Sequence, residues 1–265
     1  VCYCHTPMRY AWEMEEQYLR DFRIRGALRN MVKKQLKRLR RWDLSTARRV
    51  DVFIANSTET QSRIRRIYGR DSIVIPPPVD DCFFQTAVLD QRQTSPYYLA
   101  IGRLVPYKRF DLLIQLANDM QLPLWIGGTG QDEHRLRDIA GPTVRFLGRL
   151  PDAELPALYA GTQAVLFPQV EDAGIVPLEA QASGAPLIAL GKGGVLDVVE
   201  PDVTGVLAEE QTVTAFRSAV LHAQQQQWDR NLIRQRARNF SHQRFAERIR
   251  KAVEDAVCQF SRDPA

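Results

Sequence analysis

The stretch Glu171-Asp172-Ala173-Gly174-Ile175-Val176-Pro177-Leu178-Glu179 decides the fold and the candidate site of this chain. It follows the apolar run 164–168 and leads into a helical pattern, so it marks a strand-to-helix loop. Glu171 then lies on the loop, and Glu179 lies about one and a half turns into the helix. Between them, residues 174–176 offer backbone N–H groups at a helix N-terminus, where the helix dipole also favours phosphate. Two carboxylates beside a phosphate site suit a nucleotide-sugar, because they accept hydrogen bonds from sugar and ribose hydroxyls.

A basic loop upstream supports this interpretation, which the spacing of two glutamates alone would not. The apolar run 97–101 predicts a buried strand, and Gly102-Arg103-Leu104-Val105-Pro106-Tyr107-Lys108 follows it before a helical pattern from Phe110. Arg103 and Lys108 therefore lie at the carboxyl end of a strand, where open parallel sheets bind ligands. An isolated pair of this kind would be a solvated basic loop. Because these cations share a sheet edge with Glu171, we expect them to neutralise a diphosphate.

Strand and helix patterns alternate from about residue 97 to 207, which predicts a parallel α/β sheet. The elements expected there are 97–101, 110–119, 123–126, 132–140, 143–147, 152–160, 163–167, 175–183, 186–190 and 194–199. Helices are expected at 212–227, 230–238 and 241–259 beyond it, and at 12–20 and 26–49 before it. Thr58 and Gln61 form an expected capping box for a helix that ends near Gly69.

The motifs resemble those of a known enzyme family when they are taken together. The Gly102-Arg103-Leu104-x-x-x-Lys108 loop, the Glu171-x7-Glu179 pair with its inner Gly174-Ile175-Val176, and Phe146-Leu147-Gly148-Arg149-Leu150 resemble the retaining glycosyltransferases of family four. The opening Tyr3-Cys4-His5-Thr6-Pro7-Met8-Arg9-Tyr10-Ala11-Trp12 resembles a bacterial branch, the mannosyltransferases of surface-polysaccharide and O-antigen assembly. The likeness runs along essentially the whole chain to Phe240-Ser241-His242-Gln243-Arg244-Phe245.

This resemblance implies the α/β GT-B fold, in which two Rossmann-like domains face each other across a cleft. Residues 1–78 are then the remainder of the N-terminal, acceptor-side domain. Residues 79–239 form the C-terminal domain that binds the nucleotide-sugar, and 240–265 form a helix that crosses back. Only about 75 residues precede the triple proline at 76–78, whereas a domain usually has roughly 100–200 residues, so the first domain is expected to be incomplete.

The resemblance also assigns roles to single residues. The donor-binding set is Gly102, Arg103, Lys108, Leu150, Glu171, Gly174, Ile175, Val176 and Glu179, and the catalytic set is His5 and Glu171. Glu171 holds hydroxyls of the transferred sugar, Glu179 holds the ribose, and the backbone around Leu150 meets the base. His5 faces the donor across the cleft, although a lone His at a strand end also has a structural interpretation. We expect no metal, and no cofactor besides the donor, GDP-mannose. Two cations and a helix N-terminus can stabilise the negative charge of the leaving diphosphate, and no Asp-x-Asp motif occurs in the chain.

A basic segment, residues 20–49, stands apart from these motifs. It holds twelve Lys and Arg against Asp21 and Asp43, a local charge of +10 in a chain of net charge +5, so the remainder carries −5. Leu28, Met31, Val32, Leu36, Leu39 and Trp42 recur at helical spacing, while Arg29, Lys33, Lys37 and Arg40 turn elsewhere. Such an amphipathic cationic helix suits an anionic membrane surface. The alternative is that the charged face of this helix is simply solvated, while its apolar stripe packs against the rest of the protein. Nucleic acid is not expected, because neither a stacking platform nor a groove-reading motif accompanies the charge.

The expected function is therefore a retaining, metal-independent transfer of a hexose, mannose, from a nucleotide-sugar to a lipid-linked glycan acceptor. The chain shows no run of eighteen apolar residues and no signal peptide, and its four cysteines have no zinc-type second pair. These features favour a cytoplasmic protein that is peripheral at the inner face of the cell membrane. Two alternatives stay open, a sugar-nucleotide epimerase of the same fold and a non-catalytic remnant that binds membrane or nucleic acid.

Overall fold

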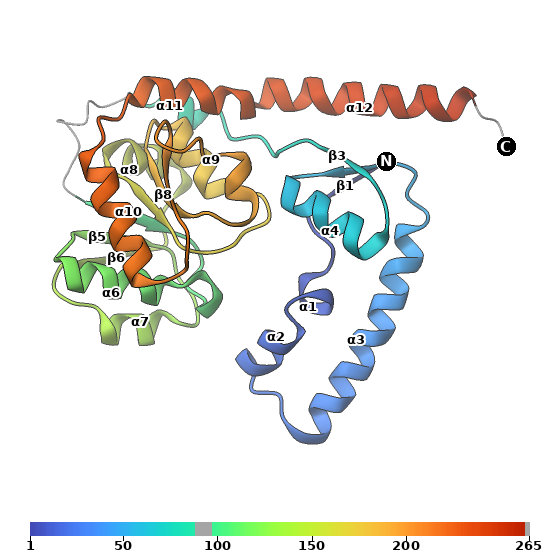
Figure 1. Cartoon of the computed structure of the whole chain (residues 1–265), viewed down its shortest axis with the longest axis horizontal. Helices are drawn as coiled ribbons and strands as arrows, with labels where there is room; N and C mark the ends of the chain where they lie inside the picture. The colour runs from blue at the N-terminus through green and yellow to red at the C-terminus, as the bar shows by residue number, and fades with distance from the viewer. Residues whose placement is uncertain (88–96, 263–265) are drawn as a thin grey trace. The chain divides into compact units, whose positions relative to one another are not determined.

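The computed structural model describes residues 1–87 and 97–262, and the chain divides into two compact units (Figure 1). Unit 1 comprises Val1–Pro76 and Glu247–Ala265, and unit 2 comprises Pro77–Ala246. The sequence analysis placed the corresponding boundaries after residues 78 and 239. The last three residues of the expected final helix, 263–265, lie outside the described residues.

Unit 1 holds a parallel sheet with the strand order β1-β2-β3. The strands are β1 (Cys2–Cys4), β2 (Phe53–Ala55) and β3 (Ser72–Val74). Helix α4 (Thr58–Tyr68) connects β2 to β3 and ends at Gly69, which adopts the left-handed conformation. The capping-box prediction is wrong by one residue, because the side chain of Ser57, not Thr58, accepts the hydrogen bond from the first turn, at Thr60 N.

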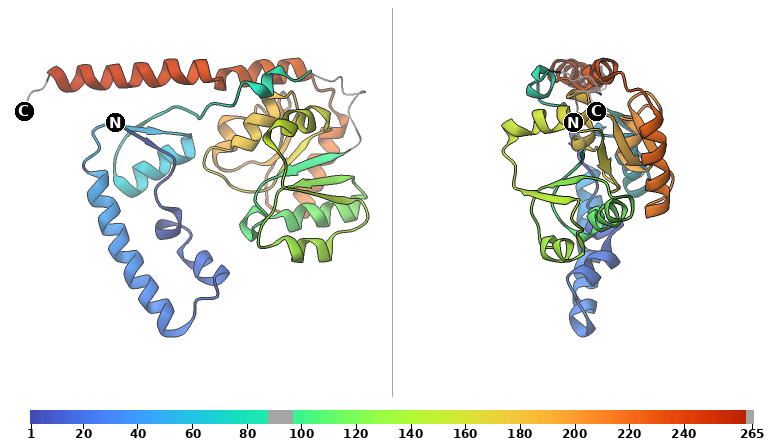
Figure 2. Two further views of the ribbon diagram at one scale, coloured as in Figure 1. Left: turned by 180° about the vertical axis from the view of Figure 1, so that it is seen from behind. Right: turned by 90° about the vertical axis from the view of Figure 1, so that its left-hand side faces the viewer.

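Three helices lie between β1 and β2 in the sequence: α1 (Arg9–Trp12), α2 (Glu15–Asp21) and α3 (Gly26–Ala47). Figure 2 shows α3 as one unbroken helix. Helix α1 contacts α3. The helix expected at 12–20 corresponds to α2, which begins three residues later than expected because the chain breaks between α1 and α2. Buried Asp43 of α3 accepts hydrogen bonds from Trp12 at 2.7 Å and Tyr68 at 3.0 Å, so one carboxylate connects α3 to both α1 and α4.

Unit 2 is built on a six-stranded parallel sheet with the order β6-β5-β4-β7-β8-β9. Its strands are β4 (Tyr98–Ile101), β5 (Leu124–Gly127), β6 (Val144–Gly148), β7 (Val165–Phe167), β8 (Leu187–Leu190) and β9 (Gly205–Ala208). Its helices include α5 (Cys82–Gln85), α6 (Phe110–Met120), α7 (Glu133–Ile139), α8 (Leu155–Gly161), α9 (Ile175–Ala182), α10 (Val213–Gln225) and α11 (Arg230–Ala237). Short 3-10 turns η2 (Pro106–Lys108), η3 (Asp152–Glu154) and η4 (Gly193–Asp197) lie between them, and α12 (His242–Arg262) follows η5 (Arg238–Phe240).

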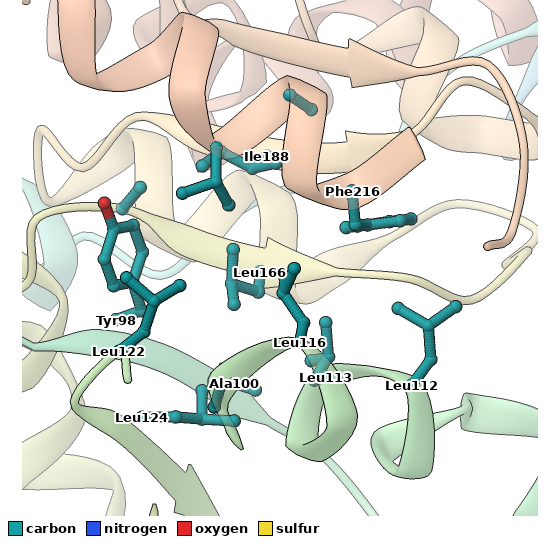
Figure 3. Close-up of a cluster of buried hydrophobic side chains, with 14 of the residues drawn as sticks. Tyr98, Ala100, Leu112, Leu113, Leu116, Leu122, Leu124, Leu166, Ile188 and Phe216 are labelled. Atoms are coloured by element: carbon teal, nitrogen blue, oxygen red, sulfur yellow. The ribbon is translucent and has the colours of Figure 1, made fainter. Parts of the chain in front are cut away.

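Side chains alternate between the two faces of this sheet, and helices cover both faces. Tyr98, Ala100 and Leu166 pack with α6 and α10 in one apolar cluster, which Figure 3 shows around Leu113 and Phe216. Leu99, Val165, Phe167 and Leu187 point the other way and pack with α5, α8 and α9. Burial on both faces explains why these strands are continuous apolar runs rather than alternating ones.

The sequence analysis missed two elements of unit 2, β9 and α5. Strand β9 is short and begins at Gly205, where a side-chain Cβ would lie 2.4 Å from the carbonyl oxygen of Leu187. The glycine therefore allows close approach of the two backbones, although glycine in a sequence usually indicates a turn. No helix in the described part of the chain is long and apolar enough to span a membrane.

Candidate functional site

The carboxyl ends of β4 and β7, which are neighbours in the sheet, place the expected site residues beside one pocket. This pocket has a volume of about 400 Å³. Its lining consists of Arg103, Tyr107, Lys108, Phe167, Glu171, Asp172, Ala173, Gly174, Ile175 and Val176. The loop after β4 contributes the two cations, and the loop after β7 contributes the carboxylate and the start of α9. We call this pocket the 103–176 pocket.

Lys108 and Glu171 form an ion pair within the 103–176 pocket, with 3.1 Å between Nζ and Oε1. Their side chains are 14% and 21% exposed, so the pair is partly shielded from water. Beyond this ion pair, Oε1 of Glu171 has no hydrogen-bond donor among the described residues. A carboxylate oxygen has more than one lone pair, so a ligand hydroxyl can donate to Oε1 beside Lys108.

The position of Lys108 depends on the backbone before it. Lys108 ends the 3-10 turn η2, and its amide donates to the Val105 carbonyl oxygen at 3.0 Å. A Cβ on Gly102 would lie 3.2 Å from Lys108 Nζ, so the absence of a side chain at Gly102 leaves room for the ammonium group. Arg103 is exposed at the pocket wall. The two cations therefore differ, because Lys108 is held in place and Arg103 faces solvent.

The N-terminus of α9 supplies the third part of the pocket. Gly174 precedes the helix in the left-handed conformation, with φ 64° and ψ 62°, and no side chain caps the first turn. The first N–H groups of a helix have no partner within the helix, so these amides can donate to a ligand oxygen. Together with Lys108 and Arg103, they make this edge of the pocket electropositive.

A glycine pair that the sequence analysis interpreted as a tight turn supports the Glu171 loop. The amide of Gly194 donates to the Glu171 carbonyl oxygen at 2.9 Å. A Cβ on Gly194 would lie 2.1 Å from the Asp172 carbonyl oxygen, and one on Gly193 would lie 2.6 Å from that of Glu171. These two residues and the pocket residues Tyr107, Phe167, Asp172 and Ala173 were missed. The Gly-Gly pair was the one available signal, because the loop that it contacts lies more than twenty residues earlier in the chain.

Four expected site residues, Gly102, Leu150, His5 and Glu179, do not line the 103–176 pocket. Gly102 directly follows β4 and lies beside Lys108. The side chain of Leu150 lies over Gly127, where an added Cβ would come within 2.5 Å of Leu150 Cδ1. Exposed His5 belongs to unit 1 and follows β1, where its carbonyl oxygen accepts a hydrogen bond from Thr60 Oγ1 at 3.1 Å. Glu179 is half-buried in α9, where Tyr159 Oη donates to its Oε2 at 2.9 Å.

The environment of Glu179 changes its ionisation. Burial raises the pKa of Glu179 to about 7, the hydrogen bond from Tyr159 lowers it in part, and the negative charge of Asp152 raises it. At neutral pH this carboxyl group is therefore divided between its protonated and ionised forms. Such a group is sensitive to a ligand that donates hydrogen bonds, because the donors favour the ionised form.

Comparisons with known proteins agree with this geometry. The family model for glycosyl transferases group 1 matches residues 84–240, more than half of the chain, and the chain belongs to this family. The GDP-mannose-dependent alpha-mannosyltransferase of Mycolicibacterium smegmatis is 33% identical over 193 residues, which cover 68% of this chain and 50% of that protein. The glycogen synthase of Pseudomonas savastanoi pv. phaseolicola is 26% identical over 191 residues, which cover 68% of this chain and 36% of that protein. This chain thus spans half or less of the length of these relatives.

A solved structure shows the fold. Anabaena Alr3699/HepE in complex with UDP and glucose has a TM-score of 0.67 at 21% identity, covering 81% of this chain and 66% of that chain. The expected α/β GT-B class is therefore confirmed, as is a glycosyltransferase of group 1.

Proposed function

We propose that this chain carries the donor site of a retaining, metal-independent glycosyltransferase that moves mannose from GDP-mannose to a lipid-linked glycan. The observation that carries the proposal is the Lys108–Glu171 pair, whose carboxylate oxygen Oε1 has no donor among the described residues beyond that ion pair. That oxygen lies in a pocket whose other wall is the uncapped N-terminus of α9. A sugar diphosphate complements both features, since its hydroxyls donate and its phosphates accept.

Each part of the pocket has a role in the proposed transfer. Lys108 and Arg103 stabilise the charge that develops on the diphosphate as the glycosidic bond breaks, and the α9 amides assist them. Glu171 accepts hydrogen bonds from hydroxyls of the transferred sugar and holds the ring in place. Glu179, which lies outside the lining of the pocket, holds the ribose. The acceptor hydroxyl attacks from the face of the leaving group, which retains the anomeric configuration.

The choice of GDP-mannose as the donor rests on the resemblance and on relatives that are named for this donor. The M. smegmatis protein is named for GDP-mannose, whereas HepE was solved with UDP and glucose. The ligands in these two names differ in base and in sugar, so a binding measurement has to distinguish a GDP-mannose donor from a UDP-linked one.

We expect isothermal titration calorimetry to detect binding of GDP and GDP-mannose, and weaker binding of UDP and ADP. The 103–176 pocket recognises the diphosphate that all three nucleotides share, so guanosine without phosphates should bind at least tenfold more weakly, since one charge-assisted contact is worth roughly 1.5–3 kcal/mol. Tighter binding of UDP would replace the proposed donor with a uridine one. The absence of binding by any nucleoside diphosphate would contradict the proposed function.

The proposed acceptor is lipid-linked because α3 has the surface of a membrane-binding helix. Leu28, Met31 and Trp42 are at least half exposed, and Val32, Leu36 and Leu39 lie along the same face. In the structure, Lys33 and Arg29 form ion pairs with Glu16, and Arg40 forms one with Glu15. Arg29, Lys33 and Arg40 are therefore paired with carboxylates of α2. The exposed cations of α3 without an ion pair among the described side chains include Lys34, Lys37, Arg38 and Arg41.

We expect the protein to sediment with anionic vesicles and not with zwitterionic ones. Replacing Lys34, Lys37, Arg38 and Arg41 with glutamine should abolish sedimentation, since each cation near such a surface is worth about 1 kcal/mol. A charge-matched control replaces four exposed arginines of unit 2, Arg135, Arg137, Arg145 and Arg149. Equal losses in the two variants, or binding that persists in high salt, would rule out α3 as the membrane contact. Binding to anionic vesicles would support the proposed peripheral position at the inner face of the cell membrane.

A further inference from the structure

Tyr159 is a fully buried tyrosine whose hydroxyl reaches the carboxylate of Glu179. Tyr159 lies on α8 and Glu179 on α9, and the hydrogen bond from Tyr159 Oη to Glu179 Oε2 is 2.9 Å long. In the part of the chain that the structure describes, the Glu179 carboxylate accepts no other hydrogen bond. One oxygen is thus held by the protein, and the other, Oε1, is left to a ligand.

The packing around Tyr159 fixes the direction of its hydroxyl. The ring belongs to the apolar cluster under α9 and lies 5.9 Å from the ring of Phe83, centroid to centroid. Burying a hydroxyl is unfavourable unless it is hydrogen-bonded, and Glu179 is the acceptor that this hydroxyl has. The ring therefore cannot turn away without leaving both groups unsatisfied.

The charged and titratable groups near Glu179 come from several elements. Tyr159 approaches from α8, Asp152 from η3 and Cys82 from α5. Arg234 of α11 also packs on α9, but its guanidinium donates to a backbone carbonyl at the end of that helix. Burial of Glu179 raises its pKa to about 7, and the negative charge of Asp152 also raises it. The hydrogen bond from Tyr159 lowers the pKa of Glu179. The hydroxyl of Tyr159 therefore favours the ionised carboxylate.

We propose that Tyr159 is a positioning residue that presents Oε1 of Glu179 to the two ribose hydroxyls of the donor nucleotide. The inference rests on the proposed function, in which Glu179 holds the ribose. An ionised carboxylate accepts two hydroxyl donors better than a protonated one, because all of its lone pairs accept and its negative charge strengthens each hydrogen bond. Tyr159 acts on the ribose through Glu179 in two ways, by fixing the orientation of the carboxylate and by favouring its ionised form.

The test compares GDP with 2′,3′-dideoxy-GDP by calorimetry between pH 6 and pH 8.5, in the wild type and in Tyr159→Phe. The ratio of the two dissociation constants isolates the ribose, because both ligands carry the same titrating diphosphate. In the wild type, the preference for GDP should rise with pH through about 7, as Glu179 ionises. In Tyr159→Phe this rise should move to higher pH, and GDP should bind about tenfold more weakly at pH 7 while dideoxy-GDP is unchanged.

Tyr97→Phe is the matched control. Tyr97 is also buried, and its hydroxyl donates to the Leu158 carbonyl oxygen of α8 at 2.8 Å, so the control removes a hydrogen bond to the same helix without touching Glu179. If Tyr159→Phe does not fold, 3-fluorotyrosine at position 159 keeps the hydroxyl as a stronger donor and should move the rise to lower pH.

The outcomes separate the two proposals. A wild type that binds no nucleoside diphosphate would overturn the proposed function and this inference with it. A wild type that binds GDP and dideoxy-GDP equally, or a Tyr159→Phe variant with the wild-type ratio at every pH, would overturn the inference alone. An equal shift of the pH profile in Tyr97→Phe would do the same.

Discussion

Replacing Lys108 with alanine is expected to weaken GDP binding by roughly tenfold to a hundredfold, the equivalent of one charge-assisted contact to phosphate. The change removes the cation that Gly102 makes room for, and it leaves the partly buried Glu171 carboxylate unpaired beside an incoming diphosphate. Both effects oppose diphosphate binding, and neither acts on guanosine. Calorimetry with GDP and guanosine should therefore show a large loss for the first and little change for the second.

A double variant separates the two effects of this substitution. Adding Glu171→Gln to Lys108→Ala removes the unpaired charge, so the double variant should bind GDP more tightly than Lys108→Ala alone. Lys192→Ala is the control, because Lys192 is exposed and lies outside the lining of the 103–176 pocket. Equal losses for guanosine and GDP would contradict the assignment of Lys108 to phosphate.

The alternating elements of unit 2 were predictable because burial on both faces of the sheet gives each central strand a distinct apolar run. Strands β4, β5, β7 and β8 and the helices between them all lie where the sequence pattern predicts them. Strand β9 was not predictable in this way, because its first residue is a glycine that serves close backbone approach. The break between α1 and α2 was also not predicted. No glycine or proline lies between these helices, and the break depends on tertiary contacts to α3.

The candidate site was predictable where motif and sheet edge coincide. Arg103, Lys108, Glu171 and the start of α9 were expected together, because the carboxyl ends of β4 and β7 meet at one edge of the sheet. Contacts between loops distant in the sequence were not predictable. The support from Gly194 to the Glu171 loop and the hydrogen bond from Tyr159 to Glu179 depend on distances that spacing does not specify. The same limit applies to α3, because spacing did not predict the ion pairs of Lys33 and Arg40 with Glu15 and Glu16.

The support of the Glu171 loop by Gly194 is sterically demanding. An added Cβ at Gly194 would lie 2.1 Å from the carbonyl oxygen and 2.7 Å from the carbonyl carbon of Asp172, and both atoms are backbone. Backbone atoms move only together with their loop, so a methyl group here has to displace residues 171–172 or the turn η4. Gly191 offers a matched position three residues earlier, where an added Cβ would meet its nearest atom at 3.4 Å, an ordinary contact.

We therefore expect Gly194→Ala to remain folded but to lose the sugar-dependent part of donor binding. Overpacking of this kind costs roughly 1–3 kcal/mol of stability, which thermal unfolding would detect as a lower Tm. Because the displaced loop carries Glu171, which we propose contacts the sugar, GDP-mannose should lose its advantage over GDP, whereas GDP itself should still bind through Lys108 and Arg103. Calorimetry with both ligands measures the difference, and Gly191→Ala should behave like the wild type in each titration. A folded Gly194→Ala variant that still prefers GDP-mannose to GDP as strongly as the wild type would show that the position of Glu171 does not govern recognition of the sugar.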